Sequence, residues 1–251
     1  MQAPWGGGGW PRGINTGGGR GLSIGYRRGV RIAVVIPALD EETRIEDAIA
    51  SARAPDVEVV VADGGSRDAT RARAEAAGAR VVASAPGRAR QLAAGVAGLE
   101  AETLLFLHAD TRLPRGWAEH VREALADAAV AGGAFRLRFD RRSFGLRAVE
   151  WGAHLRVALL ALPYGDQALF LRRSVLQALG GVPQVPLMED LDLVAGIKRH
   201  GRLARLRVSA VTSARRYEER GLLATWLRNG VAAAAWSLGV DRERVAAWYR
   251  R

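Results

Sequence analysis

The sequence has 251 residues, which is long enough for one large α/β domain or two small ones with a sizeable buried core. It contains no cysteine, and this excludes a disulfide framework and thiolate metal sites, so a bound metal would need oxygen or histidine ligands. The net charge of +11 is uneven, because residues 199–251 carry 12 arginines against four acids while residues 30–198 are nearly neutral. This distribution favours an anionic partner near the C-terminus, such as a pyrophosphate or a membrane surface, and argues against a nucleic-acid-binding protein.

The first 29 residues hold eleven glycines and lack an apolar run long enough for the core of a signal peptide. We expect them to form a disordered, glycine-rich leader. A dinucleotide-binding fingerprint would need its glycines directly after the first strand, at the start of a helix. Pro37-Ala-Leu-Asp40 stands there instead, so the sequence argues against an NAD-binding domain.

From residue 31 onward, apolar runs typical of strands alternate with amphipathic segments typical of helices. Strands are predicted at residues 31–36, 57–62, 80–84, 103–107, 133–139, 168–172 and 203–211. Helices are predicted from about residue 43, at 68–77, 88–99, 115–127 and 146–162, from residue 190, and over 222–248. This order predicts an α/β fold with a Rossmann-like, mostly parallel sheet and helices on both faces.

Four apolar runs each end in an acidic, turn-forming cluster. The clusters are Asp40-Glu-Glu42, Asp63-Gly-Gly-Ser-Arg-Asp68, His108-Ala-Asp110 and Glu189-Asp190. In an open α/β sheet, ligands bind just beyond the carboxyl ends of the strands. Carboxylates gathered there can hold a nucleotide, a metal ion and a reacting hydroxyl, so the pattern points to an enzyme.

Seven short motifs follow one another at residues 36–42, 63–68, 87–91, 107–114, 165–167, 186–190 and 215–217. In this order they resemble the family 2 glycosyltransferases of the GT-A fold. The resemblance is close to the subgroup described as radical-SAM/selenodomain-associated transferase 2, or arsenosugar-biosynthesis glycosyltransferases. It implies a single GT-A domain over residues 30–220, in which 30–129 bind the nucleotide and 130–220 form the acceptor part. Residues 221–251 would follow as a basic helical region.

The resemblance places the donor nucleotide against the first two strand ends and the loop that opens the third helix. Carboxylates accept hydrogen bonds from uracil-type N–H groups and ribose hydroxyls, and an arginine at a helix start favours phosphate. Asp63 also suits an Asx-turn or a helix cap, and Arg90 suits a solvated helix surface. The implied donor contacts are Pro37, Asp40, Glu41, Asp63, Gly64, Arg88 and Gln91.

Asp110 is the candidate metal ligand. A GT-A enzyme typically carries Asp-x-Asp, whose carboxylates hold Mg²⁺ or Mn²⁺ on the donor diphosphate, but here the first position is His108. One carboxylate suits a cation bound mainly through phosphate oxygens and water. His108 would ligate Mn²⁺, contact the donor or pack in the fold, and the sequence leaves these roles open.

Asp190, paired with Glu189, is the candidate general base. In inverting members of the family, the aspartate of this pair takes the proton of the acceptor hydroxyl as the oxygen attacks the anomeric carbon. Acids are also common at helix N-termini for dipole reasons, so a structural role stays open for this pair.

Two further motifs are implied to line the site. Asp166 and Gln167 would face the donor sugar and the acceptor, although Gly165-Asp166 also suits a plain turn. Arg215 and Arg216 would close over the diphosphate and neutralise the charge of the leaving nucleotide, although arginine is frequent throughout the chain.

The sequence therefore predicts an inverting glycosyltransferase that uses Mg²⁺ or Mn²⁺. Its donor would be a nucleotide-diphospho-sugar, expected to be of the UDP type, and its acceptor a hydroxyl compound that the sequence does not identify. A nucleotidyltransferase is one alternative, although it would usually have a Gly/Arg/Lys-rich loop after the first strand. A non-catalytic sugar-nucleotide-binding protein is the other, although it would not need Asp190.

No uninterrupted apolar stretch reaches 18 residues, so no membrane span is predicted. The C-terminal region nevertheless places Trp226, Leu227, Trp236 and Trp248 among arginines, as an interfacial helix would. Packing on its own domain is the favoured interpretation of this region. We expect a cytoplasmic protein, with peripheral contact at the inner membrane face through the C-terminal region as the open alternative.

Overall fold

The first strand carries apolar side chains on both of its faces, which explains why helices cover the sheet on both sides. In the computed structural model, which describes residues 31–250, β1 (Ile32–Ala38) points Ile32, Val34 and Ile36 into one core cluster and Ala33 and Val35 into another. A strand that buries both faces reads as a continuous apolar run, as this one does. The leader predicted for residues 1–29 lies outside the described residues.

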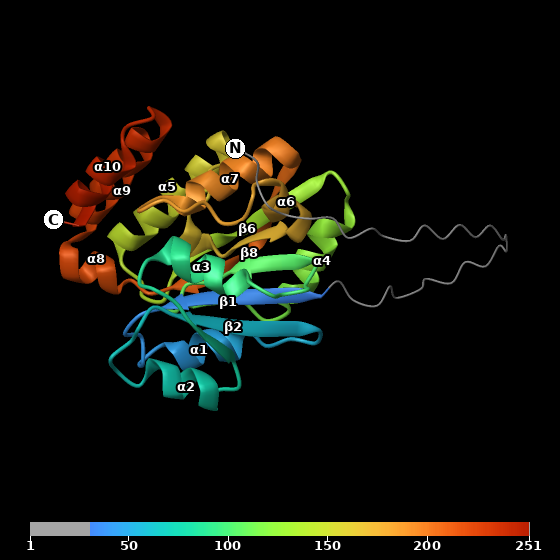
Figure 1. Ribbon diagram of the computed structural model, residues 1–251. Helices are drawn as coiled ribbons and strands as arrows, with labels where there is room; N and C mark the ends of the chain where they lie inside the picture. Colours follow the sequence, from blue (N-terminus) through green and yellow to red (C-terminus); the bar gives the residue numbers. More distant parts are fainter. Residues whose placement is uncertain (1–30, 251) are drawn as a thin grey trace, which may run out of the picture.

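One eight-stranded sheet runs through the molecule (Figure 1), in the order β3-β2-β1-β4-β7-β6-β8-β5. Strands β1 to β4, β6 and β8 run parallel, whereas β7 lies antiparallel between β4 and β6, and β5 pairs antiparallel with β8 at the edge. The prediction of a mostly parallel sheet is thus confirmed. The remaining strands are β2 (Val57–Asp63), β3 (Arg80–Ala83), β4 (Thr103–Phe106), β5 (Thr111–Arg112), β6 (Val130–Phe139), β7 (Leu169–Arg172) and β8 (Arg202–Thr212).

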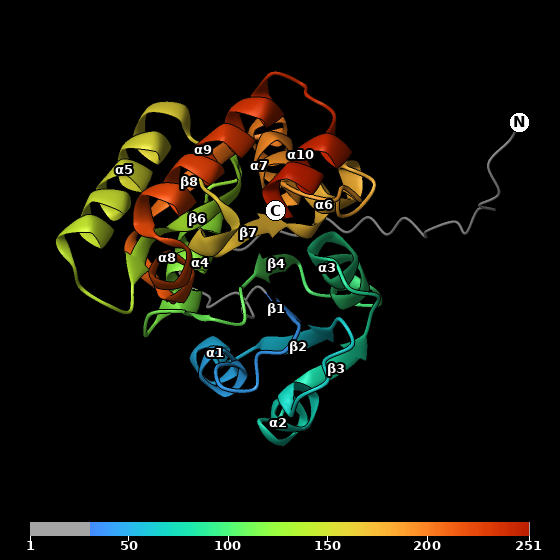
Figure 2. The same cartoon turned by 90° about the vertical axis from the view of Figure 1, so that its left-hand side faces the viewer.

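Helices cover both faces of this sheet (Figure 2). The first core cluster joins β1 to α1 (Ile45–Ala52), α2 (Thr70–Ala76) and α4 (Trp117–Ala126). The second joins it to α3 (Arg88–Val96), α6 (Arg173–Ala178) and α7 (Glu189–His200). A third, smaller cluster packs α5 (Phe144–Leu160) on the end of β6.

Close packing of α3 on β1 places the start of α3 at the carboxyl end of the sheet. A Cβ on Gly95 would lie only 2.3 Å from Cγ1 of Val35, so glycine permits this approach. The first residue of α3, Arg88, is thereby held near the end of β4. The packing of α3 on β1 thus fixes the position of Arg88 in the fold.

The C-terminal residues form three helices that lie together at one end of the molecule (Figures 1 and 2): α8 (Arg215–Arg220), α9 (Leu222–Ser237) and α10 (Arg242–Arg250). The single helical region predicted for 222–248 is broken near Gly239, which has a φ of 70°. Asp192 Oδ1 accepts hydrogen bonds from Trp236 Nε1 and Arg242 Nη2, both at 2.8 Å, and so ties α9 and α10 to α7. Within residues 31–250, the longest apolar helices fall short of what a membrane crossing would need.

Candidate active site

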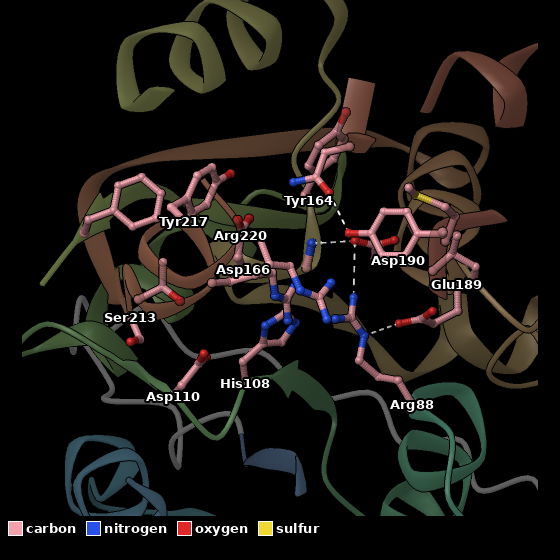
Figure 3. A pocket seen from close by; sticks show the side chains of 18 of the residues that line it. Arg88, His108, Asp110, Tyr164, Asp166, Glu189, Asp190, Ser213, Tyr217 and Arg220 are labelled. Carbon is pink, nitrogen blue, oxygen red and sulfur yellow. Dashed lines mark hydrogen bonds and ion pairs between the residues drawn. The ribbon is translucent and has the colours of Figure 1, made fainter. Parts of the chain in front are cut away.

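A cavity of about 410 Å³ lies where the loop after β4 meets the start of α7 and the C-terminal helices (Figure 3). Its volume falls in the range of small-molecule sites. The cavity brings together seven of the residues predicted from the sequence. These are Arg88, His108, Asp110, Asp166, Glu189, Asp190 and Arg216.

Arg88 joins the two carboxylates at the start of α7, as the dashed lines in Figure 3 show. Its Nε donates to Glu189 Oε1, and its Nη2 lies 3.5 Å from Asp190 Oδ2. Glu189 and Asp190 are buried, whereas the side chain of Arg88 keeps 34% of its exposure. One partly exposed cation therefore compensates two buried carboxylates, and it does so at the edge of the cavity.

Asp190 is oriented by the main chain as well. Its Oδ2 accepts a hydrogen bond from Gly165 N at 2.6 Å, and its Oδ1 accepts one from Leu191 N at 2.9 Å. Burial raises the pKa of Asp190, and Arg88 acts in the opposite direction by stabilising the charged form. A carboxylate that is fixed in this way and has a raised pKa is a suitable proton acceptor.

Gly165 leaves space at the centre of this arrangement. A Cβ at this position would lie 2.9 Å from Arg88 Nη2, 3.0 Å from His108 Nε2 and 3.1 Å from Asp190 Oδ2. Three functional groups therefore converge on one glycine. Any larger residue would push at least one of them out of place.

His108 and Asp110 form the wall after β4. Desolvation, together with Arg88 and Arg216, holds the pKa of His108 well below its usual value, so its imidazole is neutral at pH 7. Asp110 accepts one long hydrogen bond, from Thr111 Oγ1 at 3.3 Å, and otherwise offers its carboxylate to the cavity. In the part of the chain that the structure describes, no three His, Asp or Glu side chains are gathered to hold a metal ion by themselves.

Asp166 and Tyr164 line the cavity from another loop, which forms a 3₁₀ turn over Gly165–Gln167. The pKa of Asp166 is raised by burial, and its Oδ1 has no hydrogen-bond partner although it is inaccessible to solvent. Arg156 stacks on the ring of Tyr164, with Cζ 3.4 Å from the ring centroid. A buried carboxylate oxygen without a donor is a position where a ligand hydroxyl would be stabilised.

Gln167 does not face the cavity. It is buried, its Nε2 donates to Phe135 O at 2.9 Å, and its Oε1 accepts from Tyr164 N at 3.2 Å. Gln91 behaves in the same way, because its Nε2 donates to Ala38 O at 2.7 Å and to Ala62 O at 3.0 Å. These two amides hold strand ends and the loop in place, and their donors point at the main chain.

The residues predicted to hold the nucleoside lie at or just beyond the ends of β1 and β2, outside the cavity lining. Asp63 Oδ1 accepts from Ser66 N, three residues on, at 3.1 Å, which is the spacing of a capping side chain, and Asp40 Oδ1 accepts from Arg67 N at 2.8 Å. The two loops thus brace each other. Pro37 is half-buried at the end of β1, and Gly64 packs so closely that its Cβ would lie 2.9 Å from Gln91 Nε2.

Glu41 links this region to the C-terminal helices. Its Oε1 accepts from Arg215 Nη2 at 3.2 Å, so Arg215 belongs to this link and not to the cavity wall. Burial raises the pKa of Glu41, and the nearby charge of Asp110 adds to this effect. The charges of Glu41, Asp110 and Arg215 therefore influence one another. These residues come from the loop after β1, the loop after β4 and the start of α8.

The C-terminal helices supply one wall of the cavity, of which the sequence predicted only Arg216. Tyr217 stands in a motif that was recognised, but its ring packs edge-on to Phe139 at 5.0 Å, and burial raises its pKa to about 12. Tyr249 donates to Asn229 Oδ1 at 2.6 Å. Asn229, a polar residue within the mostly apolar α9, was the available signal. The unpredicted lining residues from these helices are Tyr217, Arg220, Asn229 and Tyr249.

The sheet order and a polar cavity at its carboxyl ends define a GT-A type α/β enzyme. A model of the family described as glycosyl transferase family 2 matches residues 33–176, and the chain belongs to this family. It is therefore a glycosyltransferase that uses a nucleotide-sugar, and the family sets aside the nucleotidyltransferase and the non-catalytic binding protein as alternatives. A search of curated proteins found no significant match.

Solved structures of glucosyl-3-phosphoglycerate synthase from Mycobacterium tuberculosis share the fold at low sequence identity. The complex with Mn²⁺, UDP and glucosyl-3-phosphoglycerate is 23% identical with a TM-score of 0.61, covering 90% of this chain and 88% of that one. The complex with Mn²⁺, UDP-glucose and glycerol 3-phosphate has the same identity and score, with 88% and 86% covered. The complex with Mg²⁺ and UDP is 23% identical with a TM-score of 0.60, covering 88% and 85%.

Proposed function

We propose that the protein is an inverting glycosyltransferase that moves a sugar from a UDP-type donor to an acceptor hydroxyl, with Asp190 as the general base. The observation that carries this proposal is the fixed position of Asp190 on the cavity wall, between Gly165 N–H, Leu191 N–H and Arg88. The acceptor oxygen would form a bond to the anomeric carbon while the bond from that carbon to the diphosphate breaks. The hydroxyl proton would pass to Asp190.

The other residues of the cavity would position the two substrates. We propose that Asp40, Glu41 and Asp63 lie beside the nucleoside, at the loops that they brace. Glu189 would hold Arg88 in place beside the base. Asp166, whose Oδ1 has no partner in the described residues, would accept a hydrogen bond from a sugar or acceptor hydroxyl.

The cavity fits a divalent cation only in combination with a diphosphate. Asp110 offers one carboxylate and neutral His108 offers one nitrogen, which is too few protein ligands without phosphate oxygens and water. We propose that these two residues hold Mg²⁺ or Mn²⁺, which would neutralise the charge on the leaving diphosphate. The mycobacterial synthase, which is described with either cation and UDP, supports this.

The unpaired arginines of the cavity favour an acceptor that carries an anionic group. Arg88 and Arg215 are occupied by carboxylates, whereas Arg216 and Arg220 line the cavity and form no ion pair with any described residue. Guanidinium groups bind phosphates and carboxylates well. The mycobacterial synthase is described with phosphoglyceric acid and glycerol 3-phosphate, which are both anionic hydroxyl compounds.

The subgroup of arsenosugar-type glycosyltransferases remains a proposal that rests on the seven sequence motifs. It predicts a genomic neighbourhood with radical-SAM enzymes. The residues of the cavity select for charge and hydroxyl groups, and they do not by themselves distinguish this subgroup from other members of the family.

The experiment that tests the proposed function has two stages. A thermal-shift screen of nucleotides and nucleotide sugars with Mn²⁺ should single out a UDP-sugar, which is then used in transfer assays with glycerol and glycerol 3-phosphate as paired acceptors. Asp190→Asn should still bind the donor and should lose transfer by a factor of about 10³ or more, as expected for removal of a general base. Asp47→Asn makes the same change on the exposed side of α1, outside the cavity lining, and should retain transfer. Unchanged turnover in Asp190→Asn would remove Asp190 from the mechanism.

A further inference from the structure

Two surface helices, α5 and α9, expose apolar side chains where a solvent-facing helix normally carries charges. On α5 the exposed residues recur at the spacing of one helix face, and Arg147 is the one charged residue among them. On α9 the exposed positions 223, 224, 226, 227, 230, 231, 234 and 237 include no charged residue. The exposed fraction reaches 92% for Phe144, 72% for Leu159 and 68% for Trp151.

The two helices run side by side, as both views of the fold show (Figures 1 and 2). A Cβ on Gly145 would lie 2.6 Å from Leu222 Cδ1, and one on Gly152 would lie 4.0 Å from Trp226 Nε1. Their exposed sides therefore join into one surface, which we call the apolar face. It consists of Phe144, Trp151, Leu155, Leu159, Leu223, Trp226, Leu227 and Val231.

A cluster of arginines borders the apolar face at the start of α5. A hollow of about 250 Å³ is lined by Arg138, Arg141, Arg142 and Arg147, together with Phe139 and Glu150. The carboxylate of Glu150 accepts from Phe139 N at 2.7 Å, and Arg141 pairs with Glu218. The other three arginines of the hollow form no ion pair among the described residues. The hollow thus presents uncompensated positive charge.

A second hollow joins the arginines to the apolar residues. Arg142 and Arg147 stand in its lining beside Phe144, Ala148 and Trp151. A ligand that fits both hollows has an anionic head next to an apolar chain, which is the chemistry of an anionic phospholipid. A second copy of the chain would present the same arginines to this border and would leave them uncompensated, so charge complementarity favours the lipid.

We propose that the apolar face and its arginine border dock the protein on an anionic membrane surface, without crossing the bilayer. The phenylalanine and tryptophan side chains would lie at the level of the headgroups, and Arg142 and Arg147 would contact lipid phosphates. The contact predicted from the sequence for the C-terminal region is thereby extended to α5. Trp236 and Trp248 are not part of it, because Trp236 donates to Asp192 and Trp248 packs near Arg228. This proposal stands apart from the catalytic assignments.

Flotation of the full chain with lipid vesicles tests the proposal. The protein should float with vesicles of equal parts phosphatidylglycerol and phosphatidylcholine and should remain in the dense fraction with phosphatidylcholine alone. The double variant Arg142→Gln/Arg147→Gln should bind the anionic vesicles roughly 25-fold more weakly, at about fivefold for each arginine. The control Arg71→Gln/Arg73→Gln removes the same charge from the exposed side of α2 and should bind as the unchanged protein does.

Variants of the apolar residues separate the lipid from a second copy of the chain. Trp151→Glu and Leu227→Glu should each abolish flotation while the thermal unfolding temperature stays close to that of the unchanged protein, since both side chains are exposed. Three results would each overturn the proposal. One is absence of flotation with anionic vesicles, and another is equal vesicle binding by the two double-arginine variants. The third is a dimer in solution that Trp151→Glu converts to a monomer while vesicles bind neither form.

Discussion

Replacing Arg88 by glutamine would leave the neighbouring carboxylates of Glu189 and Asp190 without the cation that they share. The two residues are 4% and 8% exposed, so water cannot take over the role of the guanidinium. Breaking a fully buried ion pair by removing one partner costs about 3–5 kcal/mol. Because the side chain of Arg88 is 34% exposed, solvent screens part of its interaction, and we expect a loss of about 2–3 kcal/mol at neutral pH.

The loss of stability should depend on pH. Without Arg88, the pKa of Asp190, which burial already raises, would rise further, because the charge of Glu189 would act on it unopposed. A carboxyl whose pKa in the folded state exceeds its unfolded value of about 4 binds more protons when folded, so stability falls as pH rises through that interval. Arg88→Gln should therefore lie closest to the unchanged protein near pH 4 and furthest from it above the raised pKa.

Catalysis offers a second measurement of the same change. Asp190 must be ionised to accept a proton, so the acidic limb of the kcat/KM profile should move to higher pH in Arg88→Gln. Urea unfolding at about pH 5 and about pH 8 gives the stability part of the comparison. Arg90→Gln is the matched control, since it removes the same charge from an exposed position of the same helix. Equal stability of the two variants at the higher pH, with an unshifted acidic limb, would refute the reasoning.

Two further changes test the centre of the cavity. Gly165→Ala should lower kcat by roughly 10- to 100-fold, because its Cβ would displace Arg88, His108 or Asp190; Gly230→Ala, with open space around its Cβ, should have no such effect, and equal kcat values would contradict the packing argument. Asp110→Ala should abolish the Mn²⁺-dependent part of UDP binding measured by calorimetry, whereas His108→Asp, which restores a second carboxylate, should strengthen it. Identical UDP titrations with and without Mn²⁺ in the unchanged protein would exclude the cation site.

The strands and most helices of residues 31–129 could be predicted from the sequence because each strand is a short apolar run with a turn cluster at its end. The direction of β7 could not. Leu169–Arg172 reads as a buried strand in either direction, and its place between β4 and β6 depends on partners more than 30 residues away. The helices α6 and α8 were not predicted as separate elements, since six residues carry too little periodicity to identify a helix.

Motif order identified seven titratable residues that line the cavity, but it missed Arg220 and could not assign the polar atoms. Gln91 and Gln167 stand in sequence motifs that predict contact with a ligand, yet their side-chain amides donate hydrogen bonds to main-chain carbonyl groups. Whether a polar side chain at a strand end turns to a ligand or to the backbone depends on the unpaired groups left by neighbouring loops, which sequence spacing does not encode. Asn229 and Tyr249 were missed because the position of their helices at the cavity depends on tertiary contacts, among them those of α9 and α10 with Asp192 of α7.

One wall of the cavity comes from a single continuous stretch of sequence, from Ser213 to Tyr249. Another side comes from separate segments, with Arg88 at the start of α3 and His108 and Asp110 in the loop after β4. Two carboxylates outside the stretch are among the groups that hold it: Glu41 accepts a hydrogen bond from Arg215, and Asp192 accepts hydrogen bonds from Trp236 and Arg242. Because the wall is one continuous segment, protein engineering could replace it as a unit. A graft from a relative that keeps the partners of these two carboxylates would alter what the cavity admits while leaving the sheet ends untouched.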